Sequence, residues 1–182
     1  MTFLPKNYEL PKSGSSYMKF EQGENLFRVL SSPIIGWLDW KEEDGKRKPL
    51  RFRMDEKPAK PFNPKKPIKH FWAMKVWNYK TEKVEVLEIT QSGIQSKIKA
   101  LVDDSDWGKP FDYDLRIVRE GEGLDTEYSL NPKPKKDLPK EIQEKADEVE
   151  VNLEALFDGE DPFVKKELAD ISGDITAEDI NF

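Results

Sequence analysis

Residues 45–80 read G-K-R-K-P-L-R-F-R-M-D-E-K-P-A-K-P-F-N-P-K-K-P-I-K-H-F-W-A-M-K-V-W-N-Y-K, and this stretch decides the interpretation. It contains twelve Lys and Arg against two carboxylates, Asp55 and Glu56. Six aromatic residues are interleaved with the cations: Phe52, Phe62, Phe71, Trp72, Trp77 and Tyr79. Cations neutralise phosphates, and aromatic faces stack unpaired bases at roughly 1–3 kcal/mol each. The mixture is therefore typical of a surface that binds an opened nucleic-acid strand. A solvated charged loop before an ordinary core strand is the alternative.

The formal net charge of −6 averages two regions of opposite sign. Residues 1–136 hold 26 Lys and Arg against 21 Asp and Glu, whereas residues 137–182 hold 4 against 15. Such asymmetry is typical of a nucleic-acid-binding body followed by an acidic tail. The 182 residues suffice for one domain with appendages.

Residue usage excludes several classes of protein. The chain has no Cys, which excludes disulfides, thiol catalysis and thiolate zinc sites. No apolar run has the length of a membrane span, and the first residues lack the pattern of a signal peptide. We therefore expect a cytoplasmic protein without a membrane partner, in the host cytoplasm if it is viral.

The pattern from residue 17 to residue 136 is mainly that of strands. Residues 1–16 contain two prolines and S-G-S-S, which predicts a flexible arm. N-L-F-R-V-L (25–30) and I-I-G-W-L-D-W (34–40) predict one long bent strand, with Pro33 and Gly36 at a bulge or corner. E-E-D-G (42–45) predicts a hairpin turn into a second strand, P-L-R-F-R-M (49–54).

The order of the remaining elements predicts an OB-fold. A stiff, cationic, proline-rich loop spans residues 55–67, and strands are predicted at 68–79 and 84–90. A helix follows from Thr90 or Ser92, and its apolar face is Ile94, Ile98, Leu101 and Val102. Two further strands are predicted at 113–119 and 126–130. Strands, one helix and two more strands make a five-stranded OB-fold barrel over residues 17–136, although other small β-rich folds share this order.

The C-terminal part is predicted to form a helix and a tail. Leu138, Ile142, Ala146, Val149, Leu153 and Leu156 make an apolar stripe over residues 137–159, with Asp137 as the cap and Gly159 as the stop. We expect this amphipathic helix to pack on the barrel, with a partner protein as the alternative. Residues 160–182 are acidic and poor in apolar groups, which predicts a disordered tail.

Three stretches resemble the phage-type single-stranded-DNA-binding proteins: G-E-N-L-F-R-V-L-S-S-P-I-I-G-W (23–37), K-H-F-W-A-M-K-V-W-N-Y (69–79) and D-I-T-A-E-D-I-N-F (174–182). The resemblance implies an OB-fold that binds single-stranded DNA without sequence preference in phage DNA replication, recombination and repair. It also implies a tail that recruits a polymerase, helicase or nuclease through Asp174, Glu178, Asp179, Ile180 and Phe182. Some relatives have a Cys/His zinc site before the third strand. Here that region has His70 and no cysteine, so we expect no metal and no cofactor.

The predicted nucleic-acid contacts are cations and stacking rings. In strand 68–79, Lys75 shares a face with Phe71, Trp77 and Tyr79. Because lysine is rarely buried, this face is predicted to be the groove, with core packing as the alternative for each ring. The predicted contacts are Arg28, Trp37, Lys46, Arg47, Lys48, Arg51, Arg53, Phe71, Lys75, Trp77 and Tyr79.

No motif predicts catalysis. Asp103, Asp104 and Asp106 are potential Mg²⁺ ligands, but a solvated turn after a helix explains them, so we expect no enzyme. An RNA-binding OB-fold protein and a protein-interaction module are the alternatives to single-stranded-DNA binding. We also hypothesise that the acidic tail occupies the groove when DNA is absent.

Overall fold

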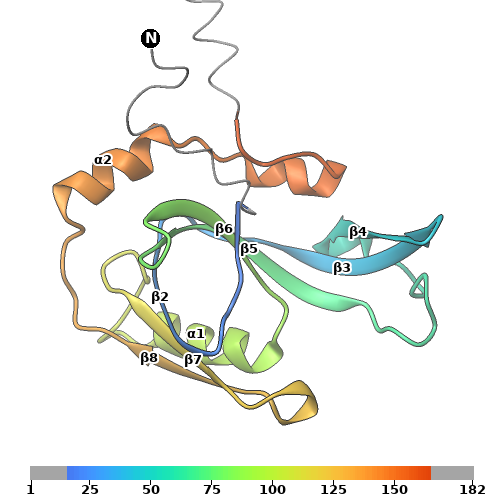
Figure 1. The fold of residues 1–182 in the computed structure, drawn as a ribbon, viewed down its shortest axis with the longest axis horizontal. Coiled ribbons are helices and arrows are strands. Elements are labelled where there is room, and N and C mark those ends of the chain that lie inside the picture. Colours follow the sequence, from blue (N-terminus) through green and yellow to red (C-terminus); the bar gives the residue numbers. More distant parts are fainter. Residues whose placement is uncertain (1–15, 165–182) are drawn as a thin grey trace, which may run out of the picture.

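The computed structural model describes residues 16–164, and these form a mainly β fold (Figure 1). The strands are β1 (Tyr17–Met18), β2 (Gly23–Val29), β3 (Ile34–Glu43), β4 (Lys46–Arg53), β5 (Lys69–Asn78), β6 (Lys83–Ile89), β7 (Leu115–Glu120) and β8 (Glu127–Pro132). The helices are α1 (Ser92–Asp103), α2 (Lys140–Glu148) and the short 3-10 helices η1 (Met54–Glu56), η2 (Gly123–Asp125) and η3 (Leu153–Asp158).

Strand β5 is the centre of one mixed sheet. The sheet runs in the order β1-β6-β5-β2-β7-β8, and β3 pairs with β5 and with β4. Along one edge of β5, Ala73 pairs with Ile34 of β3 and Val76 pairs with Val29 of β2. β2 and β3 therefore follow the same partner strand and are interrupted only around Pro33. This confirms the bent strand predicted over residues 25–40.

The sheet is open in the part of the chain that the structure describes. Within residues 16–164 no pairing joins β8 to β6, and the free edge of β6 is instead paired in parallel with β1. The β-rich class is as predicted, but a closed five-stranded barrel is not seen.

The β3–β4 hairpin extends away from the rest of the sheet (Figure 1). Its two-residue turn places Asp44 at φ 52° and Gly45 at φ 75°, both in the left-handed region. Turns of this kind match the twist of the paired strands, which is why Asp-Gly favours them. The predicted turn at residues 42–45 is confirmed.

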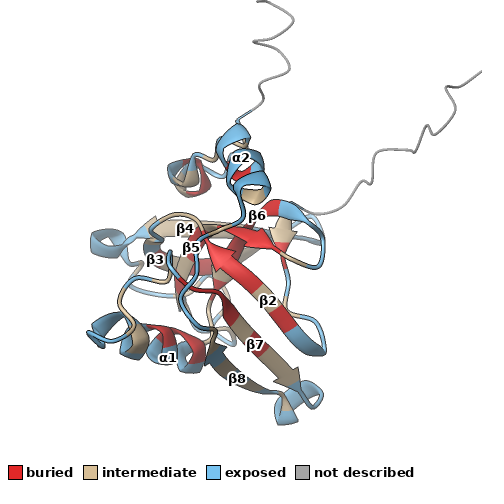
Figure 2. Ribbon diagram, turned by 90° about the vertical axis from the view of Figure 1, so that its left-hand side faces the viewer, coloured by how far each residue is buried: buried red, intermediate tan, exposed pale blue. Residues whose placement is uncertain are grey.

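The inner face of β5 packs against α1. Met74 and Val76 are buried there with Phe27 of β2 and with Ile94 and Ile98 of the helix. Trp72 packs against the same cluster. Figure 2 shows the buried residues of β2 and of one face of α1. The apolar face predicted from alternation along β5 is thus part of the main core.

The outer face of β5 is covered by residues 137–164, called the C-terminal segment below. Phe71 and Ala73 are buried against Leu156, and Trp77 is buried against Ala146. In Figure 1 the C-terminal segment runs over the top of the sheet, from α2 to η3. Packing of this segment on the sheet agrees with the prediction.

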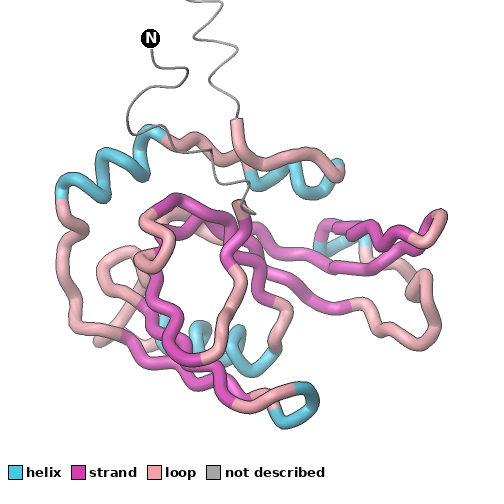
Figure 3. The backbone as a smooth tube through the Cα atoms, in the orientation of Figure 1, coloured by secondary structure: helices cyan, strands magenta, loops and turns pink. Residues whose placement is uncertain are grey.

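The single helix predicted over residues 137–159 is wrong. α2 ends at Glu148, the chain is extended around Val151, and a 3-10 helix, η3, follows (Figure 3). Val151 forms an isolated antiparallel bridge with Phe163. The β-branched Val149 and Val151 disfavour continuation of the helix. Gly159 does end η3, at φ 73°, as predicted.

Between residues 16 and 164, none of the helices is both long and apolar enough to cross a membrane.

Candidate nucleic-acid interface

Cations lie over aromatic rings on the β3–β4 hairpin and on the loop that follows it. The Arg47 guanidinium lies 4.9 Å from the centre of the Trp40 ring. The ammonium of Lys57 lies 4.2 Å from the centre of the Trp37 ring. Such pairs are attractive because the ring face is electronegative. Each pair places a cation over an aromatic face.

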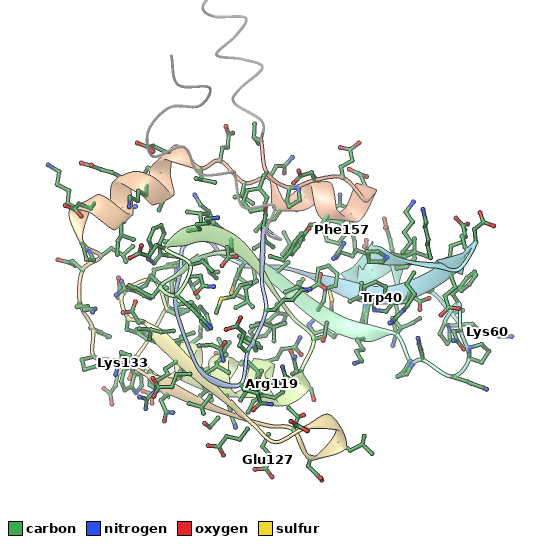
Figure 4. The ribbon with its side chains drawn as sticks, viewed as in Figure 1. Trp40, Lys60, Arg119, Glu127, Lys133 and Phe157 are labelled. Carbon is green, nitrogen blue, oxygen red and sulfur yellow. The ribbon has the colours of Figure 1, made fainter. Side chains whose placement is uncertain are left out.

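A third pair, between Lys41 and Phe62, ties the proline-rich loop to the hairpin. The Lys41 ammonium lies 5.9 Å from the Phe62 ring centre, and Phe62 is half exposed. The backbone N–H of Phe62 donates to the carboxylate of Asp39, which is buried in β3, at 2.8 Å. The loop is thereby held beside the hairpin. Figure 4 shows Lys60 on this loop, at the far end of the hairpin from Phe157.

Trp37 is held in a fixed orientation by its neighbours. Its indole N–H donates to the carbonyl of Met54 at 3.1 Å, and its ring lies 5.2 Å from the His70 ring. His70 Nε2 accepts the indole N–H of Trp72 at 3.2 Å, so Nδ1 is the protonated nitrogen and donates to the Gly36 carbonyl at 2.8 Å. A pre-oriented ring loses little entropy when a base stacks on it.

A cleft of about 750 Å³ separates the hairpin from β1 and the C-terminal segment. Its basic and aromatic residues are Tyr17, Lys19, Trp40, Lys48 and Arg51. Its acidic residues are Glu88 on β6 and Glu160 and Asp161 on the C-terminal segment. Burial raises the pKa of the Tyr17 hydroxyl above its ordinary value; nearby Arg51 opposes this effect, and Glu88 and Asp161 add to it. The cleft is therefore lined by both cations and carboxylates, of which Arg51 and Glu88 are paired with each other.

The two predicted arginines of β4 already have acidic partners. Arg51 Nε donates to Glu88 at 2.7 Å, and both side chains are largely buried. Arg53 Nη1 donates to Glu154 at 2.6 Å, and its guanidinium lies 4.4 Å over the Phe157 ring. Arg53 thereby binds the C-terminal segment (Phe157 in Figure 4). An exposed pair of this kind contributes at most about 1 kcal/mol, so a phosphate can replace Glu154.

Lys46, Arg47 and Lys48 are exposed on the hairpin, as predicted. Trp37 is half-buried and pairs with Phe52, away from the turn end of the hairpin where these three cations lie. The pairing register places Arg47, Arg51 and Arg53 on one face of the hairpin and Trp37 on the other, so the predicted contacts do not form one continuous surface.

The predicted groove along the outer face of β5 is not open. Phe71 and Trp77 are 0% and 3% exposed beneath the C-terminal segment. The Lys75 ammonium donates to the Ala146 carbonyl at 2.8 Å, in the last turn of α2. Carbonyls at a helix C-terminus attract cations, so Lys75 lies on this covered face without an unpaired charge. Phe71, Lys75 and Trp77 therefore contact the protein's own C-terminal segment.

Tyr79 and Arg28 belong to a buried ionic cluster. Arg28 is 1% exposed and donates from Nε to Asp114 at 2.6 Å. Its Nη1 and Nη2 donate to the carbonyls of Phe111 and Lys136. The Tyr79 hydroxyl donates to Asp114 at 2.8 Å. Burial, and to a smaller extent this hydrogen bond, raises the pKa of Tyr79. Arg28 is a structural residue here, although it was predicted to contact nucleic acid.

The predicted contacts omitted Trp40, Lys41, Lys57 and Phe62, although Lys57 and Phe62 belong to the stretch 45–80 that predicts nucleic-acid binding. Arg47 meets Trp40 through the register of the hairpin, whereas Lys57 and Phe62 reach it because the loop after β4 folds back on β3, and alternation along one strand reports neither. The predicted tail residues Asp174, Glu178, Asp179, Ile180 and Phe182 lie outside the described residues. Over residues 16–164, no group of three or more metal-ligating side chains is close enough to hold an ion.

Comparison with known proteins adds no assignment: no family model, no curated protein and no solved structure matches the chain.

Proposed function

We propose that this chain binds single-stranded DNA without sequence preference and acts in phage-type DNA replication, recombination and repair. The observation that carries the proposal is the set of cations over rings on the hairpin and the loop after it: Arg47 over Trp40, Lys57 over Trp37 and Lys41 over Phe62. Stacking accepts any base, because every base has a π-face, and phosphate contacts carry no sequence information.

The arrangement of elements supports an OB-fold as the framework of this activity. The hydrogen-bonded order β6-β5-β2-β7-β8, with α1 between β6 and β7, follows the OB order when β2 and β3 are counted as its first strand. In OB-folds the face of strands two and three and the loops 1–2 and 4–5 bind oligonucleotides. Here the C-terminal segment covers the outer face of β5, the counterpart of OB strand two. The connection between OB strands one and two is enlarged by β4, which forms the β3–β4 hairpin. Binding is therefore assigned to the hairpin and its cleft.

The pairs imply an exchange of partners on binding. In the free protein each cation occupies a ring face. A base stacks on the freed face of Trp37 or Trp40, while Lys57 or Arg47 turns to the adjacent phosphate. A duplex offers no unstacked base for this exchange, so single strands are preferred. With about four phosphates neutralised, log K falls with a slope of roughly −3 against log salt.

The C-terminal segment competes with nucleic acid in this scheme. It has ten Asp and Glu against two Lys. Three of its carboxylates, those of Glu154, Glu160 and Asp161, lie at Arg53 or in the cleft. The tail beyond it is assigned to recruit replication partners, because it combines carboxylates with Ile180 and Phe182.

Quenching of tryptophan fluorescence by oligo-dT tests the proposal. Oligo-dT should quench the tryptophan fluorescence of the wild-type chain, and log K should fall with a slope of roughly −3 against log salt. Trp40→Ala and Trp37→Ala should each weaken binding about 5- to 150-fold, the factor equivalent to ~1–3 kcal/mol of stacking. Trp107→Phe is the matched control, because Trp107 packs against Tyr113 on the far side of the sheet. Absence of binding at low salt, or equal losses in all three variants, would refute the proposal. Competition with matched RNA decides between DNA and RNA as the ligand.

A further inference from the structure

Asp39 is a buried carboxylate in the middle of β3, 5% exposed. None of the ion pairs formed within residues 16–164 includes it. Its Oδ1 accepts the backbone N–H of Trp40 at 2.9 Å, and its Oδ2 accepts the backbone N–H of Phe62 at 2.8 Å. Aspartate is depleted in strands, and a buried charge is costly unless it is hydrogen-bonded. The strand gives no reason for this residue, whereas its bond to the proline-rich loop does.

The neighbours of Asp39 on the same face of β3 contact the same loop. Side chains two residues apart on a strand share a face, so Trp37, Asp39 and Lys41 form one row. The Lys57 ammonium lies 4.2 Å from the centre of the Trp37 ring, and the Lys41 ammonium lies 5.9 Å from the centre of the Phe62 ring. Three successive side chains of one face therefore hold the loop.

These three contacts differ in what a nucleic acid can replace. The cation–ring contacts involve exposed groups and are weak, and a base can take the place of the cation on a ring. The hydrogen bond from Phe62 to the buried carboxylate is stronger, because its acceptor is charged. A phosphate cannot approach the buried anion of Asp39. Of the three contacts, the bond between Asp39 and Phe62 is the one that persists when Lys57 leaves Trp37.

Phe62 lies near the middle of the proline-rich loop (Lys60 in Figure 4). Prolines on both sides of it stiffen the chain: Pro58, Pro61, Pro64 and Pro67. A stiff chain that is fixed at its middle holds both of its halves near the hairpin. Each half carries two lysines: Lys57 and Lys60 before Phe62, and Lys65 and Lys66 after it. One hydrogen bond therefore sets the position of four cations.

We infer that Asp39 is a positioning residue for nucleic acid: it keeps the proline-rich loop on β3 while Lys57 turns from the Trp37 ring to a phosphate. The inference rests on the proposed function and adds a residue that itself repels phosphate. A loop that is already held in place loses little further chain entropy when its lysines bind a strand.

Amide hydrogen exchange of the free protein tests this attachment without nucleic acid. Asp39→Ala and Asp39→Val both remove the acceptor, and valine also fills the space and suits a strand. Each should speed exchange of the Phe62 N–H at least tenfold, the factor that ~1.4 kcal/mol represents. Asn63→Ala is the matched control, because Asn63 accepts the N–H of Lys65 within the same loop. Unchanged exchange in both Asp39 variants, or an equal increase in the control, would overturn the inference.

Oligo-dT titration of the same variants tests the consequence for binding. Removal of a negative charge would by itself strengthen binding to phosphates, whereas loss of positioning should weaken it about tenfold. The slope of log K against log salt should change from roughly −3 to roughly −2, because one contact to a single strand contributes about 0.7. A purely structural role would lower the urea midpoint and leave this slope unchanged. Equal or tighter binding, or an unchanged slope, would overturn the inference, whereas absence of wild-type binding would refute the proposed function.

Discussion

Replacing Asp114 by alanine tests whether Arg28 is structural. Asp114 accepts hydrogen bonds from Arg28 Nε at 2.6 Å and from the Tyr79 hydroxyl at 2.8 Å, and Lys136 Nζ lies 3.6 Å away. The side chains of Arg28 and Asp114 are 1% and 2% exposed. Removing one partner of a buried ion pair costs about 3–5 kcal/mol, because the other charge stays buried and unpaired. That is a large share of the ~5–15 kcal/mol that stabilises a typical domain.

Urea denaturation followed by tryptophan fluorescence measures this loss. With a slope of about 1–3 kcal/mol per molar urea, the Asp114→Ala midpoint should fall by about 2 M at an unchanged slope. Oligo-dT affinity, measured well below the midpoint, should stay within about twofold of wild type. Glu154→Ala is the control, because the exposed Arg53–Glu154 pair contributes at most about 1 kcal/mol. If Arg28→Ala leaves the midpoint unchanged but removes oligo-dT binding, the structural assignment is refuted.

Three other perturbations have defined outcomes. Gly36→Ala should lower stability by about 1–3 kcal/mol in thermal unfolding, because its Cβ would lie 2.2 Å from the Phe52 carbonyl, and an unchanged melting temperature would contradict this packing. Glu154→Gln should raise oligo-dT affinity about two- to fivefold by freeing Arg53, and weaker binding would argue against competition. Stability should fall as pH rises above 10, because Tyr79 ionises there when unfolded, whereas its raised pKa keeps it protonated when folded. Tyr79→Phe should flatten that fall in urea midpoints measured from pH 8 to 11.

Local patterns predicted the strands and their faces well. The period of two along β5 separated Met74 and Val76 from Phe71 and Trp77, and these pairs do lie on opposite faces. The Asp-Gly turn and the break near Pro33 were also predictable, because both depend on the backbone preferences of one or two residues.

The covered outer face could not be predicted in the same way. Lys75 predicts a solvent-exposed face, but its ammonium donates to the Ala146 carbonyl, 71 residues later in the sequence. Alternation along a strand shows that a face carries both apolar and charged residues. It does not show which distant segment packs on that face. Arg28 posed the same difficulty, since its partner Asp114 is 86 residues away. The Arg47–Trp40 pair depends likewise on the register of a hairpin, and the Lys57–Trp37 pair depends on how the loop after β4 folds back.

Leu156 and Ala146 complete the packing around Phe71 and Trp77. Deleting the C-terminal segment to study the rest of the protein therefore has a predictable artefact. A fragment that ends near residue 136 would expose two adjacent apolar surfaces around Phe71 and Trp77. Exposed apolar surfaces promote aggregation, and aggregates retain oligonucleotides nonspecifically. Gain or loss of binding after such trimming would then report solubility rather than recognition. Point substitutions at Glu154, Glu160 or Asp161 leave the C-terminal segment packed on the sheet, so they are the better test of how its carboxylates affect binding.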